Sequence, residues 1–414
     1  MPSKKIYLDN AASTPVDGEV LKAMLPYFER EYGNASSVHN FGQKARAAID
    51  RAREQVADFL NCQVSEIIFT GSATEADNLA IFGVVRDFQE RRIKPHFITT
   101  RIEHDAVLES CKKLEKEGVE VTYLPVDKEG IVRVSDVKKA IKKNTVLVSV
   151  MYANNEIGTV QPIAEIANII RNFRNSKFQA PNPKQIPNLK SQFPIFHTDA
   201  VQAVNYLDCD VKKLGVDLLT LSAHKIYGPK GVGALYVKEG TPILPIIFGG
   251  GHEQGLRPGT ENTPGIVGLG KAIEKVKSEK TSANSVESSK IKNLERLRDK
   301  LIDGILKRIP DSRLNGSRVN RLPNNANFSF RGAEGESIAI SLDREGIAAS
   351  TGSACSSKSL EPSHVLLALG LSPEEVHGSL RLTLGRYTTE EDINKVLEVL
   401  PKIIERLRKL SPFK

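Results

Sequence analysis

The sequence predicts an α/β protein in which a mostly parallel sheet is covered by helices and a smaller α+β part follows. From residue 66 onward, short apolar runs alternate with helical patterns, as they do in proteins with parallel sheets. After residue 264 this alternation stops and longer helical patterns take over. The chain has 414 residues, 40% of them hydrophobic, which is enough for one large and one smaller domain.

The first 60 residues predict one short strand and two helices. Residues 6–8 are apolar enough for a strand, and a turn-rich loop follows them. A helix is expected from Asp17 to Glu31, with Asp17 as its cap. A second helix is expected over 42–60, where small and apolar residues recur at helical spacing.

The next region supplies the sheet. The predicted strands are 67–69, 97–100, 119–124, 146–151, 194–196 and 216–221, and the helices between them are 73–88, 106–117, 135–143 and 163–173. The segment 175–193 contains three prolines and many polar residues, so it predicts an exposed loop inserted into this rhythm. Ligands of such sheets bind at the carboxyl ends of the strands, so the functional residues are expected there.

The residues after 264 predict helices over 265–280, 288–309 and 389–410, a strand over 326–331 and a helix beginning at 338. We therefore expect a large domain formed by 17–264. The smaller domain is expected to combine residues 1–16 with 265–414.

Composition excludes several classes of function. The net charge is +8 and the pI is near 9.1, but the basic residues are spread along the chain, which does not favour nucleic-acid binding. Four cysteines without CxxC or zinc spacing predict free thiols in a reducing compartment such as the cytoplasm, and no metal site. No secretory signal and no apolar stretch of about 20 residues are found, so no membrane span is expected.

Lys225 is the most informative residue. It follows the apolar run 216–221 and precedes a turn that contains Gly228, Pro229 and Gly231. A lysine in that place is either a solvated loop residue or an amine that forms a Schiff base with an aldehyde cofactor. Ser222 and His224 favour the second interpretation, because both can bind a phosphate and a charged His224 would lower the lysine pKa.

Four other strand ends carry polar residues that suit a flat, phosphorylated ring. The start of the helix at Ala73 and Thr74 is a possible anion site. His104 could stack on a ring, and Asn155 could bind a carboxylate or a ring oxygen. Asp199 could keep a pyridine nitrogen protonated, and Gln202 could reach a ring hydroxyl. Taken singly, each also fits a structural role, as a helix cap, a buried histidine or a polar turn.

Three residues beyond the sheet are further candidates. Cys355 lies in the small-residue run 349–357, which is the setting of a reactive thiol that must move. Arg381 lies in a predicted strand and could hold a carboxylate with two hydrogen bonds. Thr260 lies in the segment 257–262, which offers a hydroxyl and a cation. Cys62, Cys111 and Cys209 are interpreted as structural.

Together these residues resemble those of the cysteine desulfurases of the NifS/IscS type. The resemblance runs from residues 7–12 to residues 384–389, and its most specific pieces are 222–225, 257–262, 352–355 and 360–363. It implies fold-type I of the pyridoxal phosphate (PLP) enzymes, with a seven-stranded sheet in the large domain, and a homodimer. It also implies conversion of L-cysteine to L-alanine with the sulfur left on a cysteine.

The resemblance also implies a role for each candidate residue. Lys225 would hold PLP and move the substrate proton, His104 would stack on the ring as acid–base, and Cys355 would become the persulfide. Asn155 and Arg381 would take the substrate carboxylate. The remaining cofactor contacts would come from Ala73, Thr74, Asp199, Gln202, Ser222, His224 and, from the other subunit, Thr260.

The sulfur would pass to acceptor proteins, such as an iron–sulfur scaffold with which Cys355 could share a cluster, or to tRNA thiolation. Two alternatives remain open at this stage. Residues 248–254 and 257–264 also look similar to the selenocysteine lyases, which would not need Cys355. A binding protein that kept the fold without its chemistry would not need Lys225, Asp199 and His104 together.

Overall fold

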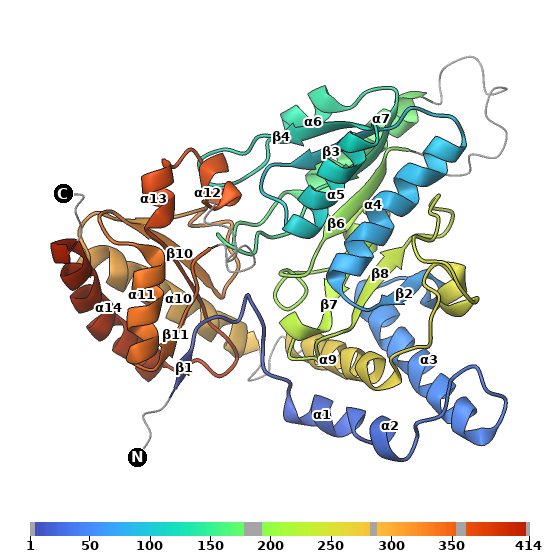
Figure 1. Ribbon diagram of the computed structural model, residues 1–414, viewed down its shortest axis with the longest axis horizontal. Helices are drawn as coiled ribbons and strands as arrows, with labels where there is room; N and C mark the ends of the chain where they lie inside the picture. The colour runs from blue at the N-terminus through green and yellow to red at the C-terminus, as the bar shows by residue number, and fades with distance from the viewer. Residues whose placement is uncertain (1–4, 178–192, 282–287, 353–361, 411–414) are drawn as a thin grey trace.

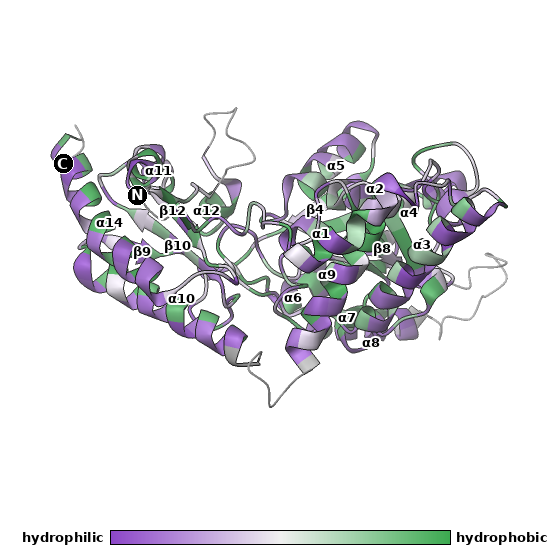
Figure 2. Cartoon of the chain, turned by 90° about the horizontal axis from the view of Figure 1, so that it is seen from below, coloured by the Kyte–Doolittle hydropathy of each residue, from purple (hydrophilic) through white to green (hydrophobic). Residues whose placement is uncertain are grey.

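The computed structural model describes residues 5–177, 193–281, 288–352 and 362–410. Figure 1 shows two bodies side by side, one built on a large sheet and one that carries most of the C-terminal third of the chain. In Figure 2, apolar residues concentrate on the strands and on the inner faces of the helices, whereas the outer helices are mixed along their length. No helix in these described ranges is long and apolar enough to cross a membrane.

The larger body contains a seven-stranded sheet with the order β2-β8-β7-β6-β5-β3-β4. Five neighbouring strands, from β4 to β7, run parallel, and β8 pairs antiparallel with both β7 and β2. The mostly parallel sheet expected from the sequence is therefore confirmed. Its strands are β2 Ile67–Thr70, β3 His96–Thr100, β4 Glu120–Leu124, β5 Thr145–Ser149, β6 Ile195–Asp199, β7 Leu218–Ser222 and β8 Gly233–Val237.

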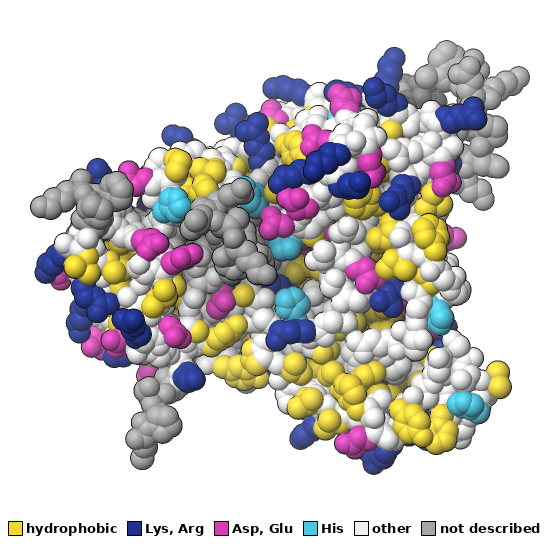
Figure 3. Space-filling model, viewed as in Figure 1, with side chains coloured by type: hydrophobic (Ala, Val, Ile, Leu, Met, Phe, Trp, Pro, Cys, Tyr) yellow, Lys and Arg dark blue, Asp and Glu magenta, His cyan; other side chains and the backbone are white. Residues whose placement is uncertain are grey.

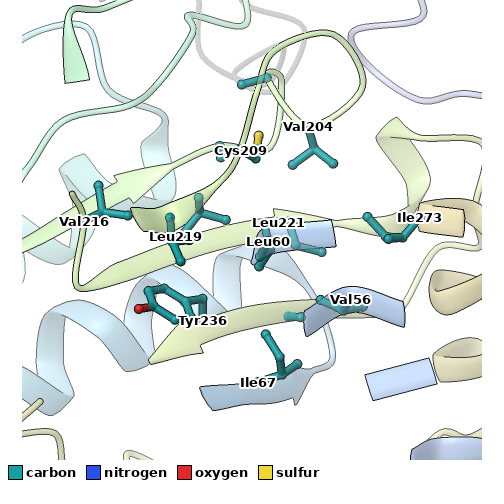
Figure 4. Close-up of a cluster of buried hydrophobic side chains, with 14 of the residues drawn as sticks. Val56, Leu60, Ile67, Val204, Cys209, Val216, Leu219, Leu221, Tyr236 and Ile273 are labelled. Atoms are coloured by element: carbon teal, nitrogen blue, oxygen red, sulfur yellow. The ribbon is translucent and has the colours of Figure 1, made fainter. Parts of the chain in front are cut away.

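Alternate residues of these strands face opposite layers of helices. Leu219 packs in the cluster that includes α3 Asn40–Leu60 and α7 Ile163–Lys177, whereas Leu218 packs in the cluster of α4 Ala73–Glu90 and α5 Asp105–Lys116. Figure 4 shows part of this first cluster, in which Leu60 is drawn beside Leu221 and Leu219 beside Tyr236. Because both faces are covered, every position in β2, β3, β5, β6, β7 and β8 is buried.

The prediction of a single helix over 17–31 is wrong. The structure has two helices, α1 Gly18–Met24 and α2 Pro26–Glu29. Pro26 begins α2, because a proline is tolerated in the first turn of a helix but not in its interior. The expected cap is confirmed, since the Asp17 carboxylate accepts a hydrogen bond from the Glu19 backbone N–H at 2.9 Å.

The smaller body is built on β10 Asn325–Phe330, which pairs antiparallel with β9 Ser312–Leu314 and β12 Ser379–Thr383. The first strand of the chain, β1 Ile6–Tyr7, pairs in parallel with β11 Ile347–Ala348. A separate hydrophobic cluster joins these strands to α10 Ser288–Arg308, α11 Gly335–Arg344 and α14 Glu390–Leu410.

Helix α9 Thr263–Thr281 packs with the larger body. Its residues Ile266, Leu269 and Ile273 are buried in the same cluster as α3 and the large sheet. We therefore propose that the boundary between the domains falls after α9 rather than at residue 264.

The remaining helices are short: α6 Val134–Ala140, α8 Val211–Leu214, α12 His364–Ala368 and α13 Pro373–His377. Helix α7 extends to Lys177, so the predicted insertion begins in helix, and its residues 178–192 lie outside the described part of the chain.

Candidate active site

A cavity of about 440 Å³ lies at the carboxyl ends of the large sheet, facing the smaller body. Figure 3 shows the surface hollowed between the two bodies at this place. Ten of the candidate residues line it: Ala73, Thr74, His104, Asn155, Asp199, Gln202, Ser222, His224, Lys225 and Arg381. Nine of them lie between residues 73 and 225 and meet because the strands of the large sheet end at this edge, whereas Arg381 comes from β12 of the smaller body.

Lys225 ends a single 3₁₀ turn, Ala223–Lys225, that follows β7 directly. Its Nζ donates hydrogen bonds to the carbonyl oxygens of Ala11 and Ala12, at 2.6 and 2.7 Å. Tyr227 just beyond has φ of 64°, so the chain turns sharply there. The amine is thus held at the cavity between β7 and the N-terminal segment.

The pKa of His224 decides whether it carries the charge that would lower the lysine pKa. Its burial, together with the neighbouring Lys225 and Lys230 charges, lowers its pKa to about 4. It therefore supplies no positive charge that would lower the lysine pKa. It remains a candidate to hydrogen-bond a phosphate.

The start of α4 is open to an anion. Ser72 caps this helix, its hydroxyl accepting from the Glu75 N–H at 3.1 Å. First-turn N–H groups of a helix have no carbonyl one turn earlier, so those of Ala73 and Thr74 can serve a ligand. On β8, a side chain at Gly233 would meet the Ser72 carbonyl carbon at 2.8 Å, so glycine is needed for the close approach.

Asp199 ends β6 and faces the cavity. Its Oδ1 accepts from the Val201 N–H at 2.9 Å, and burial raises its pKa, while this hydrogen bond and the Lys225 charge oppose the rise. Nearby, the Gln202 amide donates to the Ala11 carbonyl at 3.0 Å. A carboxyl in this place is suited to a cationic partner.

Further carboxyls, which the sequence reasoning missed, also line the cavity, among them those of Asp77 and Glu103. Asp77 on α4 is buried, with the Thr220 hydroxyl beside its carboxyl and the His197 Nε2 3.6 Å away. Glu103 is buried and its pKa is raised to about 8 by desolvation. Asp77 could have been found from helical spacing, since it lies three residues after Thr74 and on the same face.

His104 is oriented by the helix that it caps. Its Nδ1 accepts the Ala106 N–H at 3.1 Å at the start of α5. An accepting Nδ1 carries no proton, so the hydrogen of the neutral ring is on Nε2. The resting His104 is therefore a donor at Nε2.

Arg381 on β12 is 3% exposed and its hydrogen bonds are only partly used. Its Nη1 donates to the Asn155 carbonyl oxygen at 3.0 Å and its Nη2 to Asp9 Oδ1 at 2.9 Å. Its Nε has no partner among the described residues. The guanidinium therefore lines the cavity with donors still available to a carboxylate.

Two candidates are not brought into this cavity by the chain that the structure describes. Thr260 lies beside a separate, smaller pocket with Gly231 and Asn262. Cys355 lies outside the described residues. On either side of its segment, Gly352 lines the cavity, and the Ser363 hydroxyl donates to Glu156 at 2.6 Å.

The other three cysteines have the properties of structural residues. Cys111 and Cys209 are buried and Cys62 is half-buried. Desolvation raises the pKa of the Cys62 thiol to about 12 and that of Cys209 to about 11. These thiols stay protonated at neutral pH and are poor nucleophiles.

The fold and the site define a class of protein. Residues 6–396 match the family model for aminotransferase class-V, and the chain belongs to that family. Among curated relatives, it is 51% identical over 411 residues to the cysteine desulfurase IscS of Dictyoglomus turgidum, covering 99% of this chain and 97% of the relative. It is 50% identical over 410 residues to the cysteine desulfurase IscS of Methanosarcina thermophila, with coverage of 99% and 94%.

Solved structures agree with this assignment. A NifS-like protein superimposes with a TM-score of 0.86 at 37% identity, covering 97% of this chain and 100% of that one. The structure described as SspA in complex with cysteine superimposes with a TM-score of 0.76 at 38% identity, covering 93% and 100%. The expected family and fold are confirmed.

Proposed function

We propose that this chain is a PLP-dependent cysteine desulfurase that converts L-cysteine to L-alanine and leaves the sulfur on Cys355. The observation that carries the proposal is the single cavity in which Lys225, Asp199 and Arg381 converge. A lysine amine, a buried acid and a carboxylate-binding cation are what a PLP enzyme needs to act on an amino acid. The names of the curated relatives support the same reaction.

The residues present fit this cofactor. The close approach of β8 to the start of α4 leaves a cradle for a phosphate, which Ala73, Thr74, Ser222 and His224 would hold. Asp199 would bind the ring nitrogen, Gln202 the ring hydroxyl, and His104 would stack on the ring. When bound, PLP supplies an aldehyde for amines and a ring that withdraws electrons from the neighbouring carbon atoms.

Charge complementarity explains the state of Asp199. Burial alone raises its pKa, but a cationic ring nitrogen close by favours the carboxylate. Asp199 would then be ionised when the site is loaded, and its negative charge would keep the nitrogen protonated. Lys225 Nζ would move the substrate Cα proton, and His104, with its hydrogen on Nε2, would act as the acid.

The sulfur step belongs to Cys355. Its thiolate would attack the substrate sulfur, so a sulfur–sulfur bond forms and the substrate carbon–sulfur bond breaks. The electron pair stays with the carbon, which takes up a proton and becomes the methyl group of alanine. The persulfide would then pass to an acceptor, such as an iron–sulfur scaffold or the tRNA-thiolation machinery.

We also propose that the enzyme is a homodimer in a reducing compartment such as the cytoplasm. Apolar side chains are exposed along α1, α2 and the segment that follows: Leu21, Leu25, Phe28, Tyr32 and Val38. Figure 3 shows hydrophobic side chains gathered over this lower part of the molecule. A second copy would cover the patch and would bring its own Thr260 toward the phosphate. Light scattering should give twice the chain mass.

The experiment that tests the activity is alanine release by the purified protein. The wild type should release alanine from L-cysteine and carry an extra sulfur on Cys355 by mass spectrometry. Cys355→Ala should retain the cofactor but release no alanine from L-cysteine, whereas Lys225→Ala should lose the absorbance of the bound cofactor as well. If the wild type releases no alanine from L-cysteine but cleaves selenocysteine, and if Cys355 is not needed for that cleavage, the protein is a selenocysteine lyase instead.

A further inference from the structure

Asp9 is the partner of the arginine at the substrate side of the cavity. Asp9 Oδ1 accepts a hydrogen bond from Arg381 Nη2 at 2.9 Å, and the two side chains form an ion pair. Asp9 is 21% exposed and Arg381 is 3% exposed, so the pair lies at the boundary between the cavity wall and the interior. The proposed reaction assigns no step to Asp9.

The position of Asp9 does not depend on this ion pair. The backbone on both sides of it is bonded to Thr383 of β12, through Thr383 N–H to the Leu8 carbonyl at 2.7 Å and Asn10 N–H to the Thr383 carbonyl at 3.3 Å. The Asp9 carbonyl also accepts from Ala12 N–H at 3.0 Å. The Asp9 carboxylate therefore projects from a backbone that is held against Thr383, and Thr383 lies two residues after Arg381 on β12.

The Arg381 side chain, in contrast, needs external support. A long, unbranched side chain with several rotatable bonds has many rotamers, and a two-point carboxylate contact requires one orientation of the planar fork. Two acceptors define that orientation here, the Asn155 carbonyl at 3.0 Å and Asp9 Oδ1. The Nε is buried and unpartnered among the described residues, so the fork is held with donors left unused.

We propose that Asp9 is a positioning residue that holds the Arg381 guanidinium in the orientation needed to bind the α-carboxylate of the amino-acid substrate and product. This inference rests on the proposed function, since it takes Arg381 as the carboxylate site. Asp9 itself touches no substrate atom and acts only through Arg381. It would therefore affect ligands that carry a carboxylate and spare those that lack one.

A purely electrostatic role for Asp9 makes the opposite prediction. Its negative charge offsets part of the charge of Arg381, so its removal would leave a stronger cation and tighter binding of carboxylates. A positioning role predicts weaker binding, because the freed guanidinium no longer meets both carboxylate oxygens together. The direction of the change thus separates the two roles.

The experiment compares L-alanine with ethylamine, which is the same molecule without the carboxylate. Both are titrated into the holoenzyme and their dissociation constants are read from the absorbance of the bound cofactor. In Asp9→Ala the dissociation constant of L-alanine should rise by about tenfold or more, which corresponds to the loss of a hydrogen bond to a charged group. The dissociation constant of ethylamine should rise by less than about twofold. Asp9→Asn should restore much of the affinity, because its amide oxygen still accepts from Nη2.

Asp105→Ala is the matched control, since Asp105 lines the same cavity without a hydrogen bond to Arg381. It should leave the ratio of the two dissociation constants unchanged. Unchanged or tighter L-alanine binding in Asp9→Ala, or an equal loss for both ligands, would overturn the proposal. If Asp9→Ala does not fold, Asp9→Ser, whose hydroxyl is too short to reach Nη2, serves in its place.

A cofactor-free measurement separates this inference from the proposed function. In the protein without PLP, the Arg381 Nε–H signal in nitrogen-15 NMR is assigned by its loss in Arg381→Lys. The signal should exchange with solvent slowly in the wild type and in Asp9→Asn, and at least about tenfold faster in Asp9→Ala. A protein that fails to bind PLP contradicts the proposed function, whereas equal exchange in all variants contradicts the role of Asp9.

Discussion

The two walls of the cavity differ in charge and in the way that charge is held. The sheet side contributes the buried carboxyls of Asp77, Glu103 and Asp199, together with the amine of Lys225. The opposite side contributes Arg381, a cation fixed by Asp9 and by the Asn155 carbonyl. Buried carboxyls at close quarters cannot all ionise, whereas an arginine stays charged. The charge of the sheet side thus depends on how many of its carboxyls are protonated, whereas the charge of the guanidinium on the other side stays the same.

The largest effect is expected from breaking the sheet side at Asp199. Asp199→Asn should keep the fold, because the amide oxygen still accepts from Val201, yet remove the charge that protonates the ring nitrogen. Activity with L-cysteine should fall by about a thousandfold or more, which is about 4 kcal/mol at the transition state. The measurement is kcat from alanine release at saturating cofactor.

Asp77→Asn is the matched control on the same wall. Desolvation and the neighbouring Asp199 raise the Asp77 pKa well above its usual value, which favours the neutral carboxyl, so an amide should replace it with little loss. Near-normal kcat in Asp199→Asn, or a comparable loss in Asp77→Asn, would contradict the division of charge within this wall.

A smaller effect is expected on the constant side. Arg381→Lys keeps the charge but loses the planar fork, so KM for L-cysteine should rise by about ten- to a hundredfold while kcat changes less. The apparent affinity for PLP should stay within about twofold, because no proposed cofactor contact involves Arg381. A variant that lost PLP and substrate affinity together would show that the two walls are not separable.

The smallest effect concerns the pH dependence of stability. Glu103 has a folded-state pKa of about 8, above the value of about 4.3 for an unfolded chain. The folded protein therefore binds this proton more tightly, and the contribution is fully present below pH 4 and is lost as the pH rises toward 8. In urea denaturation, Glu103→Gln should flatten the fall in unfolding free energy between pH 5 and 8.

Glu109→Gln serves as its control, since Glu109 lies exposed on α5, the helix that begins two residues after Glu103. It should reproduce the pH profile of the wild type. A Glu103→Gln profile parallel to that of the wild type would mean that the carboxyl is ionised in the folded protein at neutral pH.

The sequence predicted the side of the cavity that depends on local pattern. Parallel strands end at one edge, so Lys225, Asp199 and His104 could be placed together from the positions of the strand ends alone. Strand β8 was missed because Gly231 and Gly233 make its start look like part of the preceding turn. The break in the first helix was missed although Pro26 carries its signal.

The opposite side depends on contacts between distant segments, which no local pattern reports. Asp9 belongs to a turn-rich loop, and its pairing with Arg381 follows only from the way β12 runs beside the N-terminal segment. The raised pKa of Asp77 likewise follows from burial, and the burial of an acidic residue cannot be predicted from its place in a helical pattern. Thr260 stays a prediction, because its proposed role requires a second copy.

The ion pair between Asp9 and Arg381 also sets the order in which the site can be assembled. The two residues are 372 positions apart, so the first is synthesised near the start of translation and the second close to its end. The residues proposed to hold PLP within one chain all lie between 73 and 225 and can meet as soon as the large sheet has formed. A nascent chain therefore contains all of its own residues proposed to bind PLP well before Arg381, which is proposed to bind the carboxylate of the amino acid, has been synthesised.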